Sequence, residues 1–155
     1  MSYSVLLLFI LWIFPLYDAS AQNTTEYKLL LFIDNELILR EKVSSFKIKY
    51  LEKVIDVQYD LASINYNVVD MDKKALSQSG KVELIFTCFD LKTQDAVNFN
   101  VSLDSQELDA GYLILRIYTK TKENKRKFVF GDRTFLYEYE SPIGYHLLPR
   151  RKGRR

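Results

Sequence analysis

Cysteine is almost absent from this chain of 155 residues, which has a single thiol at Cys88. One cysteine excludes an intrachain disulfide, so either the hydrophobic core suffices or Cys88 pairs with another chain. Val82, Leu84, Phe86 and Cys88 are spaced two residues apart and share one face of an expected strand. We therefore expect Cys88 to be a buried thiol, with an intermolecular disulfide or a reactive thiol as the alternatives.

Histidine and glycine are also scarce. His146 is the only histidine, and the sequence has no zinc-ligand cluster, EF-hand, phosphate-binding glycine loop or Gly-x-Ser-x-Gly elbow. A Cys88–His146 dyad is conceivable, but Cys88 lies on the expected core face. Two groups of carboxylates could ligate calcium, although solvated loop acids are the simpler interpretation: Asp70 with Asp72, and Asp104 with Glu107 and Asp109. We expect no enzymatic activity, no cofactor and no metal site.

Only one long hydrophobic run occurs, and it lies at the N-terminus. Residues 5–14 are all apolar, Pro15 ends the run, and Ala19–Ala21 places small residues where signal peptidase accepts them. As a helix this run spans about 15 Å, half of the hydrocarbon core, which argues against a membrane anchor. We expect residues 1–21 to be a cleaved signal peptide and the protein to be secreted, with no transmembrane segment in the mature chain.

The mature chain is long enough for one domain, residues 22–149, followed by a basic tail, residues 150–155. Asp18 is the only charged residue among the first 21, so the mature chain has 22 basic and 19 acidic residues, a net charge of +3. Five of the basic residues are in the tail, and without them the domain carries −2. The basic character therefore belongs to the end of the chain.

Apolar and polar residues alternate with a period of two through most of the chain, which is typical of half-buried strands. Asp34-Asn35 is expected to form a tight turn, residues 71–80 to be a polar loop with or without one helical turn, and residues 120–127 to be a charged loop. Strands are expected within the following segments: 27–33, 37–43, 46–50, 51–61, 64–68, 81–89, 97–103, 112–118 and 128–139. This spacing predicts an all-β fold, a single antiparallel β-sandwich of immunoglobulin-like or fibronectin-like architecture with roughly seven to nine strands, or a small barrel.

Two sequons match the acceptor pattern for N-glycosylation, Asn23-Thr24-Thr25 and Asn100-Val101-Ser102. The expected signal peptide would route the chain past the glycosylation machinery. Asn100 also alternates with the apolar residues of its strand, so a glycan there would point to solvent. We expect a glycoprotein modified at Asn23, Asn100 or both.

Basic residues form two clusters: Lys120, Lys122, Lys125, Arg126 and Lys127 in the expected loop, and Arg150, Arg151, Lys152, Arg154 and Arg155 in the tail. Secretion argues against a nuclear or nucleic-acid role. The alternatives are a dibasic processing site, in which Gly153 would leave an amidated Lys152, a contact with sulfated glycan or another polyanion, or a solvated terminus.

One expected strand, residues 112–118, is apolar on both faces. Tyr112, Ile114 and Tyr118 lie opposite its core face, so they either form a protein-binding surface or are covered by residues 143–148. We expect a secreted, non-enzymatic binding protein that contacts an extracellular protein or a cell-surface component. The alternatives are a secreted precursor or signalling factor processed at its basic C-terminus, and a binder of sulfated glycans through the two basic clusters.

Overall fold

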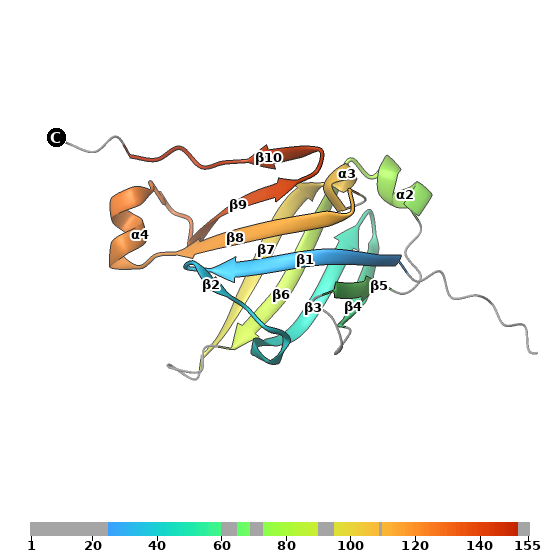
Figure 1. The fold of residues 1–155 in the computed structure, drawn as a ribbon, viewed down its shortest axis with the longest axis horizontal. Helices are drawn as coiled ribbons and strands as arrows, with labels where there is room; N and C mark the ends of the chain where they lie inside the picture. The colour runs from blue at the N-terminus through green and yellow to red at the C-terminus, as the bar shows by residue number, and fades with distance from the viewer. Residues whose placement is uncertain (1–24, 60–64, 69–72, 90–94, 109, 152–155) are drawn as a thin grey trace, which may run out of the picture.

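The computed structural model describes residues 25–59, 65–68, 73–89, 95–108 and 110–151, and β-strands predominate among them (Figure 1). The predicted all-β class is confirmed. The elements are, in chain order, β1 (Thr25–Ile33), β2 (Glu36–Leu37), the 3-10 helix η1 (Arg40–Lys42), β3 (Val43–Tyr50), β4 (Lys53–Tyr59), β5 (Asn65–Val68), α2 (Lys73–Gln78), β6 (Lys81–Phe89), β7 (Ala96–Asp104), α3 (Ser105–Leu108), β8 (Tyr112–Thr119), α4 (Lys122–Lys127), β9 (Phe135–Ser141) and β10 (Gly144–His146). In these parts of the chain no helix has the length and apolar character needed to cross a membrane.

The strands are arranged in the order β10-β9-β8-β1-β5-β4-β3-β6-β7, and β2 pairs with the end of β1. Neighbouring strands are antiparallel except β1 and β8, which run parallel with Leu29 opposite Leu113, so the expected antiparallel pairing is wrong at this contact. Strand β4 links the two sheets, because its first residues pair with β3 and its last residues pair with β5. In Figure 1, β1 and β8 pass in front of β3, β6 and β7. The finer expectation of an immunoglobulin-like or fibronectin-like sandwich stays a prediction.

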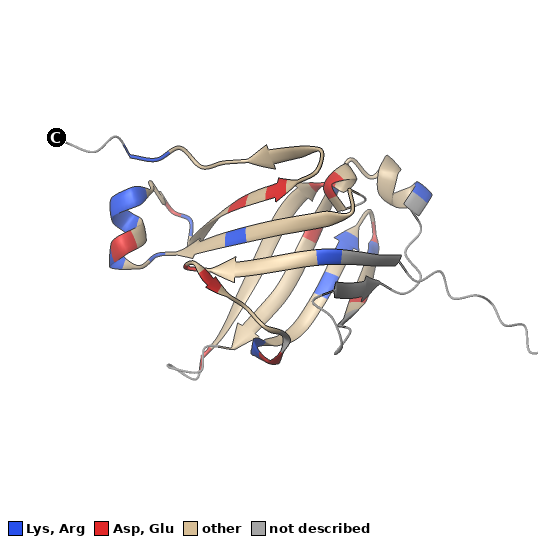
Figure 2. Cartoon of the chain, in the orientation of Figure 1, with Lys and Arg blue, Asp and Glu red and all other residues tan. Residues whose placement is uncertain are grey.

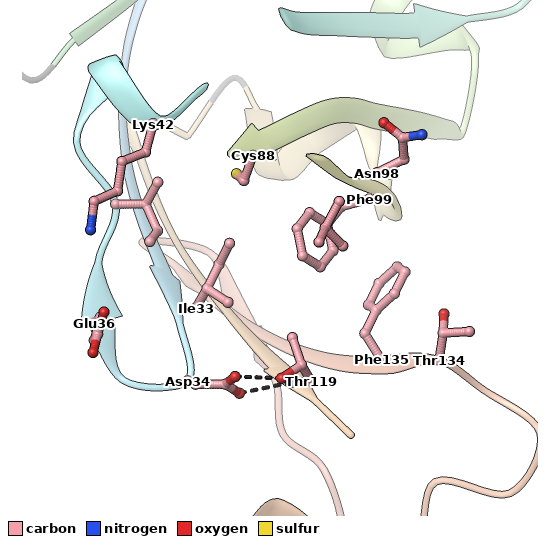
Figure 3. Close-up of a pocket in the computed structure, with 12 residues that line it drawn as sticks. Ile33, Asp34, Glu36, Lys42, Cys88, Asn98, Phe99, Thr119, Thr134 and Phe135 are labelled. Atoms are coloured by element: carbon pink, nitrogen blue, oxygen red, sulfur yellow. Dashed lines mark hydrogen bonds between the residues drawn. The ribbon is translucent and has the colours of Figure 1, made fainter. Parts of the chain in front are cut away.

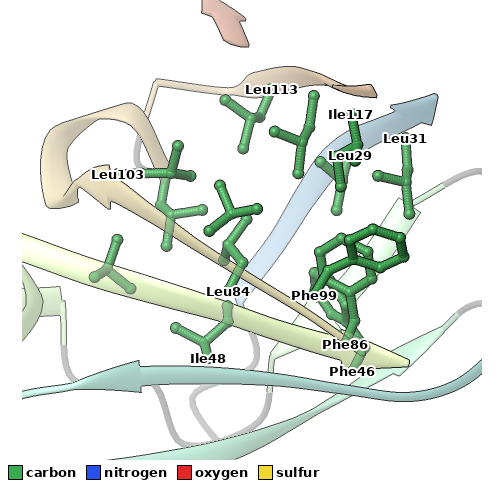
Figure 4. Close-up of a cluster of buried hydrophobic side chains, with 14 of the residues drawn as sticks. Leu29, Leu31, Phe46, Ile48, Leu84, Phe86, Phe99, Leu103, Leu113 and Ile117 are labelled. Atoms are coloured by element: carbon green, nitrogen blue, oxygen red, sulfur yellow. The ribbon is translucent and has the colours of Figure 1, made fainter. Parts of the chain in front are cut away.

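The larger core cluster lies between the strands of both sheets (Figure 4). Leu29 and Leu31 of β1 and Leu113, Leu115 and Ile117 of β8 belong to it. The other sheet supplies the inward residues that alternation predicts for β3, β6 and β7: Phe46, Ile48 and Tyr50, Val82, Leu84, Phe86 and Cys88, and Phe99, Val101 and Leu103. Alternation thus identified the buried face of each of these strands.

The predicted turn at Asp34-Asn35 is confirmed. Both residues have positive φ, 50° and 70°, and they connect β1 to β2 as a two-residue loop. Asn and Asp tolerate this left-handed backbone better than other non-glycine residues. The Asp34 carboxylate also accepts a hydrogen bond from the Thr119 amide at 2.8 Å and one from the Thr119 hydroxyl. The turn is therefore fixed to the end of β8.

Several segments differ from the sequence-based expectation. Residues 128–139 were expected to be a strand, but β9 begins only at Phe135. Residues 37–43 were expected to be one strand, but Leu37 ends β2, η1 follows, and Val43 begins β3. Residues 120–127, expected to be a loop, contain the helix α4. The hydroxyl of Thr121 accepts a hydrogen bond from the Asn124 amide at the start of this helix, and Glu123 pairs with Lys127 one turn later. These local contacts stabilise a helix that has no apolar periodicity.

The C-terminal segment forms a further strand and a second hydrophobic cluster. Strand β10 pairs with β9, and Leu148 then packs against a buried group on the outer side of β8 and β9. This group consists of Tyr118, Phe128, Phe130 and Leu136. The sequence left open whether the outer face of β8 is a binding surface or is covered by the C-terminal segment. Tyr118 is buried in this cluster, whereas Tyr112 remains exposed.

Candidate functional site

Helix α4 presents its basic residues to solvent. Lys122, Lys125, Arg126 and Lys127 are all exposed, and Asn124 is the buried residue of the helix. The Asn124 amide group donates to Asp34 at 2.5 Å and to the carbonyl of Thr119 at 3.0 Å. These bonds hold the inner side of the helix on the β1–β2 turn and leave the basic side free.

The chain returns to α4 after β10. The Arg151 amide donates a hydrogen bond of 2.8 Å to the carbonyl of Lys127, the last residue of the helix. The guanidinium of Arg150 lies over the ring of Phe128, 5.3 Å from its centroid. The two basic clusters, separated in sequence by more than twenty residues, therefore meet at one end of the molecule.

Glu138 of β9 holds this return in place. Its side chain is buried, and its carboxylate accepts hydrogen bonds from the Tyr118 hydroxyl at 2.8 Å and the Leu148 amide at 3.0 Å. The Arg150 guanidinium lies 4.0 Å away. Burial, and secondarily the hydrogen bond to Glu138, raise the pKa of the Tyr118 hydroxyl, so it remains a donor at neutral pH. The alternation in β9 predicted an exposed Glu138, because it places this residue on the face opposite to Tyr137 and Tyr139.

We call the exposed cations at this end the basic surface: Lys120, Lys122, Lys125, Arg126, Lys127, Arg150 and Arg151 (Figure 2). Three acidic residues accompany them: Glu123, which pairs with Lys127 at 2.6 Å, the buried Glu138, and Asp34, which accepts a hydrogen bond from the Asn124 side chain. The seven basic and three acidic residues named here give a net charge of +4. In the described part of the chain, Lys122, Lys125 and Arg126 form no ion pair, so their charges are available to a ligand.

Several predicted site residues lie elsewhere. Lys152, Arg154, Arg155 and the sequon at Asn23 are outside the described residues. Asn100 is exposed on β7, as expected, and its amide nitrogen donates to Glu83 at 3.2 Å. Its glycosylation stays a prediction.

Cys88 and His146, the nucleophile and base of the candidate dyad, have different surroundings in the structure. Cys88 is buried at the end of β6, which confirms the buried thiol, and this burial raises its pKa from 9.0 to about 12. His146 instead stacks on Tyr139, with ring centroids 5.6 Å apart, and lies near Tyr137. These contacts place His146 on the aromatic rings of β9 and not beside the thiol.

The candidate calcium carboxylates are engaged by other groups where the structure describes them. Asp104 pairs with Lys81 at 2.6 Å, and the buried Glu107 accepts a hydrogen bond from the Ser141 hydroxyl. Asp70, Asp72 and Asp109 lie outside the described residues. Among the residues that are described, no cluster of three potential metal ligands occurs.

Comparisons of the chain with models of protein families, with curated proteins and with solved structures yield no match. Any functional conclusion therefore depends on the surfaces of this structure.

Proposed function

We propose that this protein is a secreted, non-enzymatic β-sandwich of immunoglobulin-like or fibronectin-like type that binds sulfated glycans of the extracellular space through its basic surface. One observation carries the proposal: the hydrogen bond from the Arg151 amide to the Lys127 carbonyl, which joins two basic clusters into one surface. Between the alternatives that the sequence left open, this contact favours the polyanion over a solvated tail.

A flexible polyanion suits this surface for physical reasons. Each exposed ion pair contributes little by itself, about 0.2–1 kcal/mol, so affinity depends on several cations meeting one ligand. Pre-arranged cations reduce the conformational entropy that is lost on binding. A chain with repeated sulfates can contact α4 and the C-terminal segment at the same time and release its counterions, which makes the affinity depend strongly on salt.

The direct test is calorimetric titration with a heparin hexasaccharide, which is short enough to report on one surface, at several salt concentrations. We expect the double variant Lys122→Gln/Lys125→Gln to bind about three- to tenfold more weakly and to lose about 2 from the slope of log K against log salt. The single variant Arg151→Gln retains the backbone amide that docks the tail. Arg151→Gln should nevertheless weaken binding of the hexasaccharide, because the tail belongs to the same surface.

The control is Lys47→Gln/Lys49→Gln, which removes two charges from half-exposed lysines of β3 that pair with Asp56 and Glu83. Long-range attraction by net charge predicts the same loss for both double variants, whereas a defined surface predicts a much smaller loss for the control. Equal losses, or binding that does not respond to salt, would contradict the proposal.

The precursor alternative is tested separately by mass spectrometry of the native C-terminus. Our proposal expects an intact Arg150–Arg151 pair, because the Arg150 side chain contacts Phe128 and the Arg151 backbone is bonded to α4. An amidated Lys152, or a chain that ends before Arg150, would establish maturation instead.

A further inference from the structure

A cavity of about 550 Å³, open to solvent on one side, lies at the end where β1, β6 and β8 finish and β7 and β9 begin. Its walls are mainly apolar, and six side chains supply them: Ile33, Ile38, Cys88, Val97, Phe99 and Phe135. Figure 3 shows Ile33, Cys88, Phe99 and Phe135 around one space. The volume is in the range of pockets that hold small organic ligands, roughly 300–1,000 Å³.

The register of β7 shows that the core leaves this end unfilled. Alternation places Val97 on the same face as Phe99, Val101 and Leu103, which are buried to 2% exposure or less. Val97 is nevertheless 41% exposed, although its neighbour across the ladder, Cys88, is buried. An inward-facing valine exposed to a cavity costs hydrophobic free energy that an apolar ligand would recover.

The edge of the cavity is held rigidly. The Asp34 carboxylate accepts bonds from the Thr119 amide, the Thr119 hydroxyl and the Asn124 amide group. On the inner wall, Phe99 and Phe135 pack edge to face with ring centroids 5.2 Å apart. The cavity is therefore preformed, and a ligand would not have to order it.

The polar groups at the edge favour an uncharged ligand. Three are charged, Asp34, Glu36 and Lys42, and they leave a net charge of −1 that disfavours a carboxylate head. A cationic head gains little, because the Asp34 carboxylate is already satisfied, Glu36 has an interaction of its own, and Lys42 would repel it.

Thr134 is an uncharged hydrogen-bonding residue exposed at the edge of the cavity (Figure 3). Its hydroxyl can donate to a carbonyl or accept from a hydroxyl of a ligand. Asn98 has no such role, because it alternates with the inward-facing Val97 and Phe99, and its side-chain oxygen accepts from the Thr87 hydroxyl at 2.7 Å on the outer face of the sheet. A ligand with one hydroxyl or carbonyl group would therefore find a partner at Thr134.

From these observations we infer that the cavity binds one uncharged, mainly apolar small molecule that carries a single hydroxyl or carbonyl group. The apolar body lies against Phe99, Phe135 and Val97, and the polar group lies at the edge near Thr134. This site is separate from the basic surface, so the protein carries an apolar ligand independently of its attachment to glycans.

The experiment is a fluorescence titration of the purified secreted protein with Nile red, an uncharged dye that brightens in apolar surroundings, followed by competition. We expect saturable one-to-one binding that dodecanol displaces and that dodecanoate and dodecylamine displace about tenfold less well, because the edge repels a carboxylate and offers an ammonium group no unengaged carboxylate. No saturable binding, or stronger displacement by either charged competitor, would overturn the inference.

Variants locate the binding. Val97→Trp fills the mouth and should weaken Nile red about tenfold or more, whereas the matched control Val54→Trp, an exposed valine of β4 outside the cavity, should not. Thr134→Trp, at an exposed position of the edge, provides a second obstruction if Val97→Trp does not fold. Unchanged Nile red binding in a folded obstructed variant places the dye elsewhere and refutes the site. Heparin binding should be unaffected in every case, which separates this test from that of the glycan surface.

Discussion

The substitution Glu138→Gln tests how the C-terminal segment is attached. Glu138 is 3% exposed and accepts hydrogen bonds from Tyr118 and the Leu148 amide, one on each carboxylate oxygen. Glutamine has nearly the same volume but offers one acceptor oxygen and one amide group. One of the two donors must therefore face another donor and lose its bond.

The magnitude follows from these contacts. A hydrogen bond to a charged group contributes about 1.5–3 kcal/mol, and a buried donor left without a partner costs about 1–3 kcal/mol. Removing the buried charge offsets part of the loss, because the carboxylate no longer has to be desolvated. We expect Glu138→Gln to lower the free energy of unfolding by about 2 kcal/mol, which for a domain of this size lowers Tm by about 6–10 °C.

Glu140→Gln is the matched control. Glu140 lies on the same strand, but its side chain is 49% exposed and pairs with Arg116 at 3.7 Å. Such an exposed pair contributes about 0.2–1 kcal/mol. Urea unfolding of both variants measures the difference, and equal stability would show that Glu138 does not hold the segment.

The heparin hexasaccharide gives a second measurement with a definite sign. Removing a carboxylate beside a basic surface should strengthen binding if only net charge matters. If Glu138 positions Arg150 and Arg151, its loss should instead weaken binding, by about three- to tenfold, and increase hydrogen exchange at the Arg151 amide. Tighter binding with an unchanged exchange rate at Arg151 would refute the positioning role.

Three further predictions concern single positions. Leu51 is exposed between β3 and β4 at a φ of 50°, which asparagine adopts more readily than leucine. Leu51→Asn should therefore raise Tm by about 2–4 °C in a thermal melt, and no gain would show that the turn is unstrained. Burial raises the pKa of Cys88 from 9.0 to about 12 in the folded state. The contribution of the neutral thiol to stability is therefore complete below pH 9 and is lost as the pH rises from 9 towards 12. In urea titrations across that interval, wild type should lose more stability than Cys88→Ala, by at most about 1.4 kcal/mol per pH unit. Asn100→Gln should remove a glycan mass from protein made in a secretory host, and an unchanged intact mass would show that this sequon is unused.

Alternation predicted the faces of β3, β6, β7 and β8 because each of these strands has an inner face against the core. The same pattern misled at β9. Tyr137 and Tyr139 alternate with Glu138, which favours an outward carboxylate, yet residues 128–130 and the C-terminal segment cover this second face. Period-two alternation identifies two faces of a strand but not whether something later in the chain covers the outer one.

Long-range pairing left no local signal. The parallel contact of β1 with β8 joins segments about eighty residues apart, and nothing in residues 27–33 specifies that partner. The helix at Lys122–Lys127 escaped prediction for a different reason, since its stability comes from the Thr121 cap and polar contacts rather than an apolar stripe. Charge composition nevertheless identified both basic clusters, because exposed cations need no particular fold to be recognised in a sequence.

The arrangement of Asp34, Asn124 and Lys127 connects the two proposed sites. Asp34 follows β1 at the edge of the cavity and accepts a hydrogen bond from the Asn124 side chain of α4. The last residue of α4, Lys127, accepts the hydrogen bond from the Arg151 amide. The rigid edge of the apolar cavity and the support of the basic surface are therefore the same group of hydrogen bonds. Coupling between the sites requires that one ligand change this group, and a preformed edge gives a ligand little to change. We expect dodecanol and the hexasaccharide to bind independently, and calorimetric titration of one in the presence of the other measures this directly.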